Sequence, residues 1–459
     1  MMEKTCPESE ATAQPSLSRR RLLQRTGVIG LSVAAAAAGT RTAAAAGRFA
    51  VPAVRTTANQ ATAQVEGSLS LAYLGTADQV PAWEALFALF KKTYPNITLH
   101  AQANPVNDWA GFFDSISTQI AGGKTPDIVQ VATEGQRLFA SRGLVEPINE
   151  LIDRDKDELA DYFADIHPNL IKWNEQYNNS PDGKTFYLPG DFNTMGVWYN
   201  TDVLKKTGVA EPTDDWTWAD LTAAGEKIVA SGAYGINVTP EYFISVMPYL
   251  LTNGASTLSE DWTKATVNSP AAIEAATFMR SLVEKKISPV PGGTFDQFTA
   301  TAQGKMAMFG GGRWPVLNMR KLNVVDKIKI VAWPHQKEKG SPVGWGAYPI
   351  MKGTKNREAA WAFVKFIASK EASVYFAQQG GTIVPGRKSV ANSDAYLANA
   401  PAGSIKLYEA LEYATPIPSP DKGNVVQKAI EDAFKQILVG NVTPEDGLNA
   451  LNTTIQGNL

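Results

Sequence analysis

Residues 69–131 alternate between strand-like and helix-like patterns, and this alternation limits the fold more than any other feature of the sequence. Apolar, β-rich runs are separated by segments whose apolar side chains recur every three or four positions, the spacing of one helix face. Such alternation predicts a parallel sheet covered by helices. Ligands of these sheets bind beyond the carboxyl ends of the strands, which here directs attention to Thr76, Thr133 and Glu134. The expected strands are 69–74, 97–99 and 128–131, and the expected helices are 83–94 and 109–120.

Residues 183–200 are interpreted as a crossing from one lobe to another. The run places aromatic residues beside one carboxylate, Asp191, and Pro189-Gly190 divides it into two strand-like halves. A β-rich run with such a break favours a chain that leaves one lobe and enters the next. Aromatic rings beside an acid also suit a polar ligand of the size of a sugar.

After this crossing the strand and helix patterns resume and predict a second α/β lobe. Thr217, with Asp220 three positions later, predicts a capping box at the start of a helix. A strand over 304–309 is expected to run into a flexible glycine segment at 310–312. The other expected elements are strands at 234–238 and 328–333 and helices that begin near 242, 270, 357, 426 and 444.

The composition narrows the functional classes. With 459 residues the chain is long enough for two or three domains. A net charge of −2 gives no reason to expect a nucleic-acid partner. The only cysteine, Cys6, excludes an intrachain disulfide framework and a thiolate zinc site. His100, His167 and His335 form no metal-binding or hydrolase pattern, so we expect no metal, no cofactor and no catalytic residue.

The amino-terminal segment reads as a secretory leader. Ser18–Leu23 (SRRRLL) is similar to the twin-arginine export motif, and the apolar run over 28–38 is too short for a bilayer span of about 20 residues. We expect a twin-arginine-type signal peptide over 1–47, a linker over 48–67, and a periplasmic or other extracytoplasmic location. The alternatives are a basic amphipathic helix or a membrane anchor. No cysteine follows the apolar run, so lipid anchoring is not expected.

Several short segments, taken in order, are more specific together than any one of them alone. They resemble segments of family 1 extracellular solute-binding proteins, the maltose-binding-protein-like sugar receptors of ABC importers. The likeness extends over nearly all of residues 68–459 with consistent spacing. The segments are Gly122–Val129 (GGKTPDIV), Tyr187–Pro189 (YLP), Trp198–Asn200 (WYN), Thr217–Leu221 (TWADL), Gly344–Gly346 (GWG) and Asn356–Trp361 (NREAAW).

The resemblance implies an α/β, two-lobe periplasmic-binding-protein fold of the type II-like kind, with lobes that are discontinuous in sequence and joined by a multi-strand hinge. It further implies a monomer that holds a carbohydrate between its lobes, closes on it and delivers it to ABC permease subunits. The expected first lobe is 68–189 plus 346–395, the second is 196–341 plus 400–459, and the crossings lie near 190–195, 342–346 and 395–400.

The resemblance and the residue types also suggest ligand-binding residues. Aromatic plates are expected from Trp345 and Trp314, and carboxylates from Glu134 and Asp191. The plainer alternatives are inter-lobe packing for Trp345, a helix-start acid for Glu134 and a turn residue for Asp191. The further candidates are Arg313, with a surface salt bridge as its alternative, Tyr242, Phe243, Thr76 and Arg387.

Two other functions fit parts of this pattern. Aromatic rings and carboxylates also form the clefts of glycoside hydrolases or lyases, with Glu134 and Asp191 as the pair. The same fold could instead take a phosphorylated polyol, a peptide or a metal chelate. Phosphate recognition would need clustered lysines and arginines, whereas those of this chain are scattered. We therefore expect a binding protein and not an enzyme.

Overall fold

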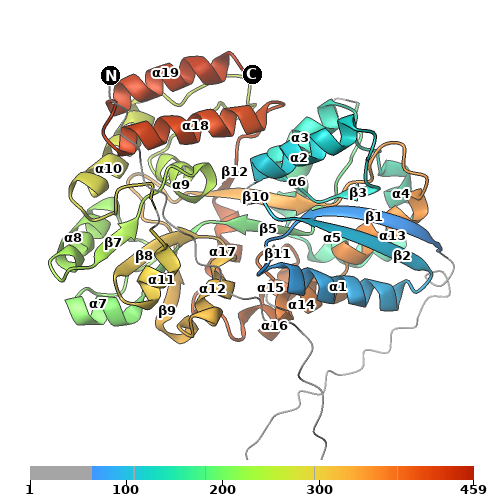
Figure 1. The fold of residues 1–459 in the computed structure, drawn as a ribbon, viewed down its shortest axis with the longest axis horizontal. Helices are drawn as coiled ribbons and strands as arrows, with labels where there is room; N and C mark the ends of the chain where they lie inside the picture. The colour runs from blue at the N-terminus through green and yellow to red at the C-terminus, as the bar shows by residue number, and fades with distance from the viewer. Residues whose placement is uncertain (1–64, 107–108, 181, 294, 380) are drawn as a thin grey trace, which may run out of the picture. The chain divides into compact units, whose positions relative to one another are not determined.

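The computed structural model describes residues 65–459 apart from 107, 108, 181, 294 and 380. The expected signal peptide over 1–47 and most of the expected linker over 48–67 lie outside the described residues. The described residues form three β-sheets with helices packed around them (Figure 1). None of the described helices is long and apolar enough to cross a membrane.

The first sheet is the parallel one that the alternating pattern predicts. Its strand order is β2-β1-β3, and Leu71 of β1 lies opposite Ile128 of β3. Asp127, just before β3, accepts hydrogen bonds from the backbone N–H and hydroxyl of Ser70 (2.8 and 2.6 Å), which fixes the two strands side by side. The strands are β1 (Gly67–Leu74), β2 (Ile97–Asn104) and β3 (Ile128–Val129).

The helices of this lobe come from two distant parts of the chain. The early ones are α1 (Val80–Thr93), α2 (Trp109–Ala121), α3 (Thr133–Ser141), α4 (Asn149–Arg154), α5 (Lys156–Asp165) and α6 (Pro168–Asn178). The late ones are α13 (Arg357–Ala368) and α14 (Lys370–Gln378). Phe90 of α1 packs against Phe363 and Phe366 of α13, with ring centroids 5.1 and 5.2 Å apart. The late helices therefore complete the core that the early ones begin.

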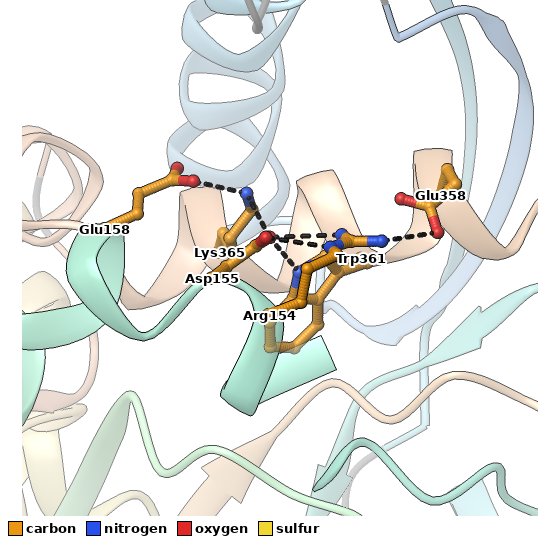
Figure 2. Close-up of polar contacts among 6 residues, drawn as sticks. All are labelled: Arg154, Asp155, Glu158, Glu358, Trp361 and Lys365. Carbon is orange, nitrogen blue, oxygen red and sulfur yellow. Dashed lines mark hydrogen bonds and ion pairs between the residues drawn. The ribbon is translucent and has the colours of Figure 1, made fainter. Parts of the chain in front are cut away.

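A polar network also fastens α13 to the short helices α4 and α5 (Figure 2). Asp155, at the junction of α4 and α5, accepts hydrogen bonds from Trp361 Nε1 and Lys365 Nζ, each at 2.7 Å. Arg154 donates to Glu358 (3.0 Å), and Lys365 also reaches Glu158 (2.5 Å). The side chains of Asp155 and Lys365 are each only 15% exposed, so this pair is less open to water than an ordinary surface pair.

The second lobe is built on a mixed sheet of order β7-β8-β6-β9, in which β6 is antiparallel to both of its neighbours. The segment expected to be flexible is instead partly strand, since Gly310 and Gly311 end β8 and pair with Val197 and Gly196. A Cβ on Gly310 would lie 2.7 Å from the ring of Trp333, which explains why the strand needs glycine there. The strands are β6 (Gly196–Asn200), β7 (Tyr234–Asn237), β8 (Met306–Gly311) and β9 (Ile328–Val331).

The helices of the second lobe begin largely where expected. The capping box is confirmed, because Thr217 N donates to Asp220 Oδ2 (2.9 Å) and Asp220 N donates to Thr217 Oγ1 (3.2 Å). The helix expected from residue 242 begins as a π-helical turn, η2 (Tyr242–Val246). The others are α7 (Thr201–Thr207), α8 (Trp218–Val229), α9 (Met247–Leu251), α10 (Pro270–Glu284), α11 (Gln297–Ala302), α12 (Pro315–Lys321), η3 (Val325–Lys327), α18 (Gly423–Leu438) and α19 (Pro444–Gln456).

A third sheet joins the two lobes, and in Figure 1 its strands β5 and β10 run between them. The strand expected over 128–131 is divided, because β3 stays in the first sheet while β4 pairs with β10 of the third. The strands are β4 (Val131–Ala132), β5 (Asp191–Thr194), β10 (Ser341–Ala347), β11 (Val384–Pro385) and β12 (Ala414–Pro416). Between β11 and β12 lie α15 (Lys388–Ala391), α16 (Asp394–Leu397), α17 (Lys406–Glu409) and η4 (Ala410–Glu412). The residue boundaries proposed for the lobes remain a prediction.

Candidate ligand-binding site

Side chains alternate between the two faces of the joining sheet, and this alternation decides which residues can meet a ligand. Asn193 lies opposite Gly344 and Asp191 lies opposite Gly346, so these four residues share one face. Phe192 and Trp345 are paired on the other face. We call the face shared by Gly344 and Gly346 the open face of the sheet, because neither glycine places a side chain on it, whereas the opposite face is aromatic.

Trp345, expected to contact ligand, is placed by the structure in the core. Its side chain is 1% exposed and its ring is stacked on Trp173 of α6, with centroids 6.3 Å apart. Its backbone N–H donates to Thr133 Oγ1 (2.8 Å) and its carbonyl accepts from Gln136 Nε2 (2.8 Å). The reason is its register, since it occupies the face of β10 opposite to the one that Gly344 and Gly346 leave open.

The first lobe contributes Thr133 and Glu134, which begin α3 directly after β4. A carboxylate in the first turn of a helix is favoured by the helix dipole. Burial nevertheless raises the pKa of Glu134 to about 7, and the nearby Glu431 carboxylate of α18 adds to this rise, while a backbone hydrogen bond opposes it. Glu134 is therefore a carboxyl group held between the lobes with a weakened preference for its charged form.

The second lobe contributes two aromatic rings, Phe243 and Trp314, whose centroids are 6.4 Å apart and tilted by 46°. A Cβ on Gly344 would lie 3.5 Å from Phe243 Cε2 and 3.7 Å from Thr133 Oγ1, so groups from both lobes meet at this glycine. A Cβ on Gly312 would lie 2.4 Å from the ring of Trp314 and 2.7 Å from Asn193 Oδ1.

We call this group the inter-lobe site. Asn193 is held in it because its Oδ1 accepts from the backbone N–H of Arg313 (2.8 Å). The group contains one carboxyl, one amide, one hydroxyl and two aromatic rings, with room left by a glycine. Its members are Thr133, Glu134, Asn193, Phe243, Trp314 and Gly344.

Tyr242 borders the inter-lobe site but uses its hydroxyl within its own lobe. The side chain is 1% exposed, and its hydroxyl shares a hydrogen bond with Thr257 Oγ1 (2.7 Å). Burial raises the pKa of Tyr242 well above its usual value, with Thr257 opposing and Glu134 adding to the rise. Its backbone N–H donates to Glu431 (3.2 Å), which holds that carboxylate near Glu134.

Asp191 lies on the open face of the joining sheet but is enclosed by the first lobe. Its carboxylate lies against Gly346, where a Cβ would come within 2.5 Å of Oδ1. It borders a small cavity of about 30 Å³ that is also lined by Trp83 and Tyr348. Burial raises the pKa of Asp191 to about 7, opposed by the backbone N–H of Gly346.

The structure does not bring Arg313 or Thr76 into the inter-lobe site. Arg313 is 1% exposed, and its guanidinium lies 4.3 Å from the ring centroid of Tyr396 and donates to the Tyr396 carbonyl (3.0 Å). It therefore anchors the segment around α16 to the second lobe and is not a surface ion pair. Thr76 lies in the turn before α1, where its carbonyl accepts from the N–H groups of Gln79 and Val80 (2.9 and 3.0 Å).

Arg387 is likewise buried, and it is paired with Asp161 (2.8 Å) and Asp165 (3.3 Å) of α5. Three members of the site, Asn193, Thr133 and Gly344, were not among the predicted ligand residues. Asn193 follows Asp191 by two positions in a strand, so the period of two could have indicated it. Thr133 follows the third expected strand directly. Glu431 gives no sequence signal, because only folding brings α18 to α3.

The part of the chain that the structure describes contains no group of three or more His, Cys, Asp or Glu side chains placed to hold a metal ion. The inter-lobe site combines an aromatic surface with a few hydrogen-bonding groups, and its residues come from both lobes. Sites of this kind suit an organic ligand with a C–H-rich face and polar edges.

Two α/β lobes joined by a multi-strand sheet, with aromatic and polar groups facing one another between them, define the class of two-lobe ligand receptors that close around a solute. The chain belongs to the bacterial extracellular solute-binding protein family, whose model matches residues 76–374. This family consists of binding proteins, and its extracellular setting implies that its members are exported and work with ABC transporter permeases.

Individual relatives agree with this assignment. A binding protein of Brucella abortus (strain 2308) is 24% identical over 388 residues, which cover 80% of this chain and 86% of that protein. The arabinooligosaccharide-binding protein of Bacillus subtilis (strain 168) is 23% identical over 298 residues, 61% of this chain and 65% of that protein. Among solved structures, the ABC substrate-binding protein Lmo0181 of Listeria monocytogenes, in complex with cycloalternan, has a TM-score of 0.75 at 24% identity, covering 86% of this chain and 99% of that one.

Proposed function

We propose that this chain is a non-catalytic, monomeric receptor that captures a carbohydrate in the inter-lobe site and presents it to an ABC permease. The observation that carries the proposal is that Phe243 and Thr133 meet at Gly344, opposite Asn193, with Trp314 beside Phe243 and Glu134 next to Thr133 at the start of α3. Aromatic rings pack on the C–H face of a sugar, while carboxyl and amide groups bond its hydroxyls. The arabinooligosaccharide and cycloalternan receptors support a carbohydrate ligand.

The charges around the site favour an uncharged sugar over a phosphorylated one. Burial raises the pKa of both Glu134 and Glu241, and the nearby Glu431 carboxylate adds to each rise. The nearby Arg137 is already paired with Asp421 (3.1 Å). A phosphate would need unpaired cationic or N–H donors and would be repelled by these acids.

Hydrolysis is not favoured by the placement of the two candidate acids. A glycosidase needs two carboxyl groups that flank one scissile bond. Asp191 lies against Gly346 beside the small cavity in the first lobe, whereas Glu134 lies near Glu431 of the second lobe. Export by the twin-arginine-type leader, and retention in the periplasm or another extracytoplasmic envelope, complete the proposal.

The ligand can be identified by mass spectrometry of the small molecules that copurify from the native host, followed by calorimetric titration of the unloaded protein. We expect one carbohydrate that binds saturably and is recovered unchanged. Absence of any heat or thermal shift across a broad sugar panel would overturn the carbohydrate assignment. Release of shortened products would overturn the non-catalytic assignment.

A further inference from the structure

The two lobes also touch one another directly, away from the inter-lobe site, through four side chains that come alternately from one lobe and the other. Tyr177 of α6 stacks on Trp262 of the second lobe, with ring centroids 4.2 Å apart and only 12° between the planes. The guanidinium of Arg137, on α3, lies 5.9 Å from the centroid of the same Trp262 ring. Arg137 Nε also bonds Asp421 Oδ1 (3.1 Å), just before α18. We call these four residues the inter-lobe latch.

The loop that carries Trp262 is built to present this ring. It is a tight hairpin in which Leu258 bridges Ala265 and Ser259 N donates to the carbonyl of Lys264 (2.9 Å). Asp261 accepts from the hydroxyls of Ser259 (2.6 Å) and Thr263 (2.8 Å). These bonds lie within the second lobe, so the hairpin keeps its shape whether or not the first lobe is near.

Trp262 itself adopts a backbone φ of 60°, the left-handed region that a bulky L-residue rarely occupies. Its side chain is only 4% exposed, although it lies in a hairpin loop. Tyr177 covers one face of this ring. Tyr177 is itself partly buried and packs against two hydrophobic clusters, one of which includes the core of the first lobe and the other the core of the second. Separation of the lobes would therefore uncover a large aromatic face that the hairpin holds in place.

A further contact lies beside the latch. Asn424 of α18 donates to Asp114 of α2 (3.2 Å), and a Cβ on Gly423 would lie 3.0 Å from the carbonyl oxygen of Glu134. The first turn of α18 thus rests directly on α2 and α3. These contacts use groups of this chain alone.

From this geometry we infer that the inter-lobe latch stabilises the closed form by itself, so that the receptor closes in the absence of sugar and the sugar adds to a closure already favoured. A ligand can shift such an equilibrium only by its differential affinity for the two forms. A latch of this kind reduces the share of the closing free energy that the ligand must supply. The inference concerns closure and does not depend on which solute is bound.

The test is single-molecule energy transfer between dyes at Glu150→Cys in α4 and Lys206→Cys in α7, in a full chain whose Cys6 is replaced by Ser, with no sugar present. We expect the unaltered latch to give mainly closed molecules. Trp262→Ala and Tyr177→Ala should each raise the open-to-closed ratio about 3- to 10-fold, in keeping with the strength of a stacked aromatic pair. The double variant should open little further than the stronger single one, because both remove the same contact.

Matched controls separate the latch from general destabilisation. Trp218 and Phe278 stack within the second lobe at 4.3 Å and 7°, so Phe278→Ala removes a similar pair that does not join the lobes. Its open-to-closed ratio should stay unchanged. Arg137→Ala, at a partly exposed position, offers a second latch variant if Trp262→Ala does not fold.

Two results would overturn the inference. The first is a sugar-free chain that is mainly open before any substitution. The second is a set of latch variants whose ratios equal that of the unaltered chain or of Phe278→Ala. Since no sugar enters the experiment, either result leaves the proposed carbohydrate binding to be judged by its own titration.

Discussion

At the scale of single residues, Trp314 and Phe243 give the inter-lobe site its aromatic surface. We predict that Trp314→Ala weakens binding of the recovered sugar by about 1–2 kcal/mol, roughly 5- to 30-fold, because the sugar loses one stacking face. Calorimetric titration measures the change. Phe295→Ala, which removes a 39% exposed ring, serves as the control and should bind as the unaltered chain does. Equal affinities for the two variants would remove Trp314 from the site.

We predict that Asp191 makes the free energy of unfolding depend on pH. Its pKa is raised to about 7 by burial, so the folded chain holds a proton that the unfolded chain releases near pH 4. Because the folded chain binds this proton more tightly, the contribution of Asp191 to the free energy of unfolding falls as pH rises from about 4 to 7. Below about pH 4 and above about pH 7 that contribution no longer changes with pH. Asp191→Asn removes the charge and keeps an acceptor for the N–H of Gly346.

We therefore expect Asp191→Asn to be more stable than the unaltered chain at pH 8 by on the order of 2–4 kcal/mol, and equal to it near pH 4. Urea unfolding at the two pH values measures this. A variant that is less stable at pH 8 would show that the Asp191 carboxylate is favourably bound in its charged form.

Only some of the site residues could be predicted from the sequence. Glu134, Phe243 and Trp314 were expected from residue type and resemblance, and the structure brings them together. Trp345 was expected beside them on the same grounds, but a tryptophan suits a core as well as a sugar. Its register relative to Phe192 decides between the two, and register depends on a strand that lies far away in the sequence.

At the scale of elements, β10 offers a matched pair of glycines on one face. A Cβ on Gly346 would lie 2.5 Å from Asp191 Oδ1, whereas one on Gly344 has its nearest neighbour at 3.5 Å. We predict that Gly346→Ala lowers the free energy of unfolding by about 1–3 kcal/mol, since the enclosed carboxylate has little space to move. Gly344→Ala should leave stability nearly unchanged.

The same pair should behave in the opposite way toward ligand. The Gly344→Ala methyl would occupy the point where Phe243 and Thr133 meet, and should weaken sugar binding. Thermal melts and titrations of both variants provide the four values needed. Two equally stable variants with equal affinities would contradict this account of the open face of β10.

Helix periodicity and the capping box were readable from the sequence because they depend on neighbours within a few positions. The division of 128–132 between two sheets was not. Val129 pairs with Ala72, which comes earlier in the sequence, whereas Ala132 pairs with Gly346, which comes much later. The two halves of this short segment therefore belong to different sheets. The π-helical start at Tyr242 had no local signal of its own.

At the scale of the whole molecule, the Asp155 network ties the late helix α13 to the first lobe. Hydrogen bonds from Arg154, then from Lys365 and Trp361, hold the pKa of Asp155 well below its usual range against the opposing effect of burial. Its contribution to stability is therefore present above about pH 4 and is lost as pH falls through the lower folded value.

We predict that Asp155→Asn costs about 2–3 kcal/mol of unfolding free energy at pH 7, because Lys365 and Arg154 each lose a partly buried charged partner. Asp432→Asn, which breaks the exposed pair with Lys428 on α18, is the control and should leave the free energy of unfolding nearly unchanged. Chemical unfolding of both variants decides the matter. A loss for Asp155→Asn as small as that of the control would show that the network adds nothing to α13 packing.

The two-lobe fold was implied by the family resemblance that the ordered motifs carry, and the structure confirms it. The inter-lobe latch did not follow from them. Its four residues lie in α3, in α6, in a hairpin loop and before α18, and nothing in their local sequence indicates that they meet. Such contacts depend on how closely the two lobes approach each other, and no local sequence pattern predicts that distance.

The late arrival of α13 has a consequence for how the protein is made. Phe90 leaves the ribosome long before Phe363 and Phe366, the rings that cover it. The second lobe must likewise wait for α18 and α19, which come after all the other described helices in the sequence. Each lobe can finish its core only after its late helices have been made, so folding is dominated by long-range contacts. Until then the nascent chain exposes apolar helix faces that chaperones must protect from aggregation.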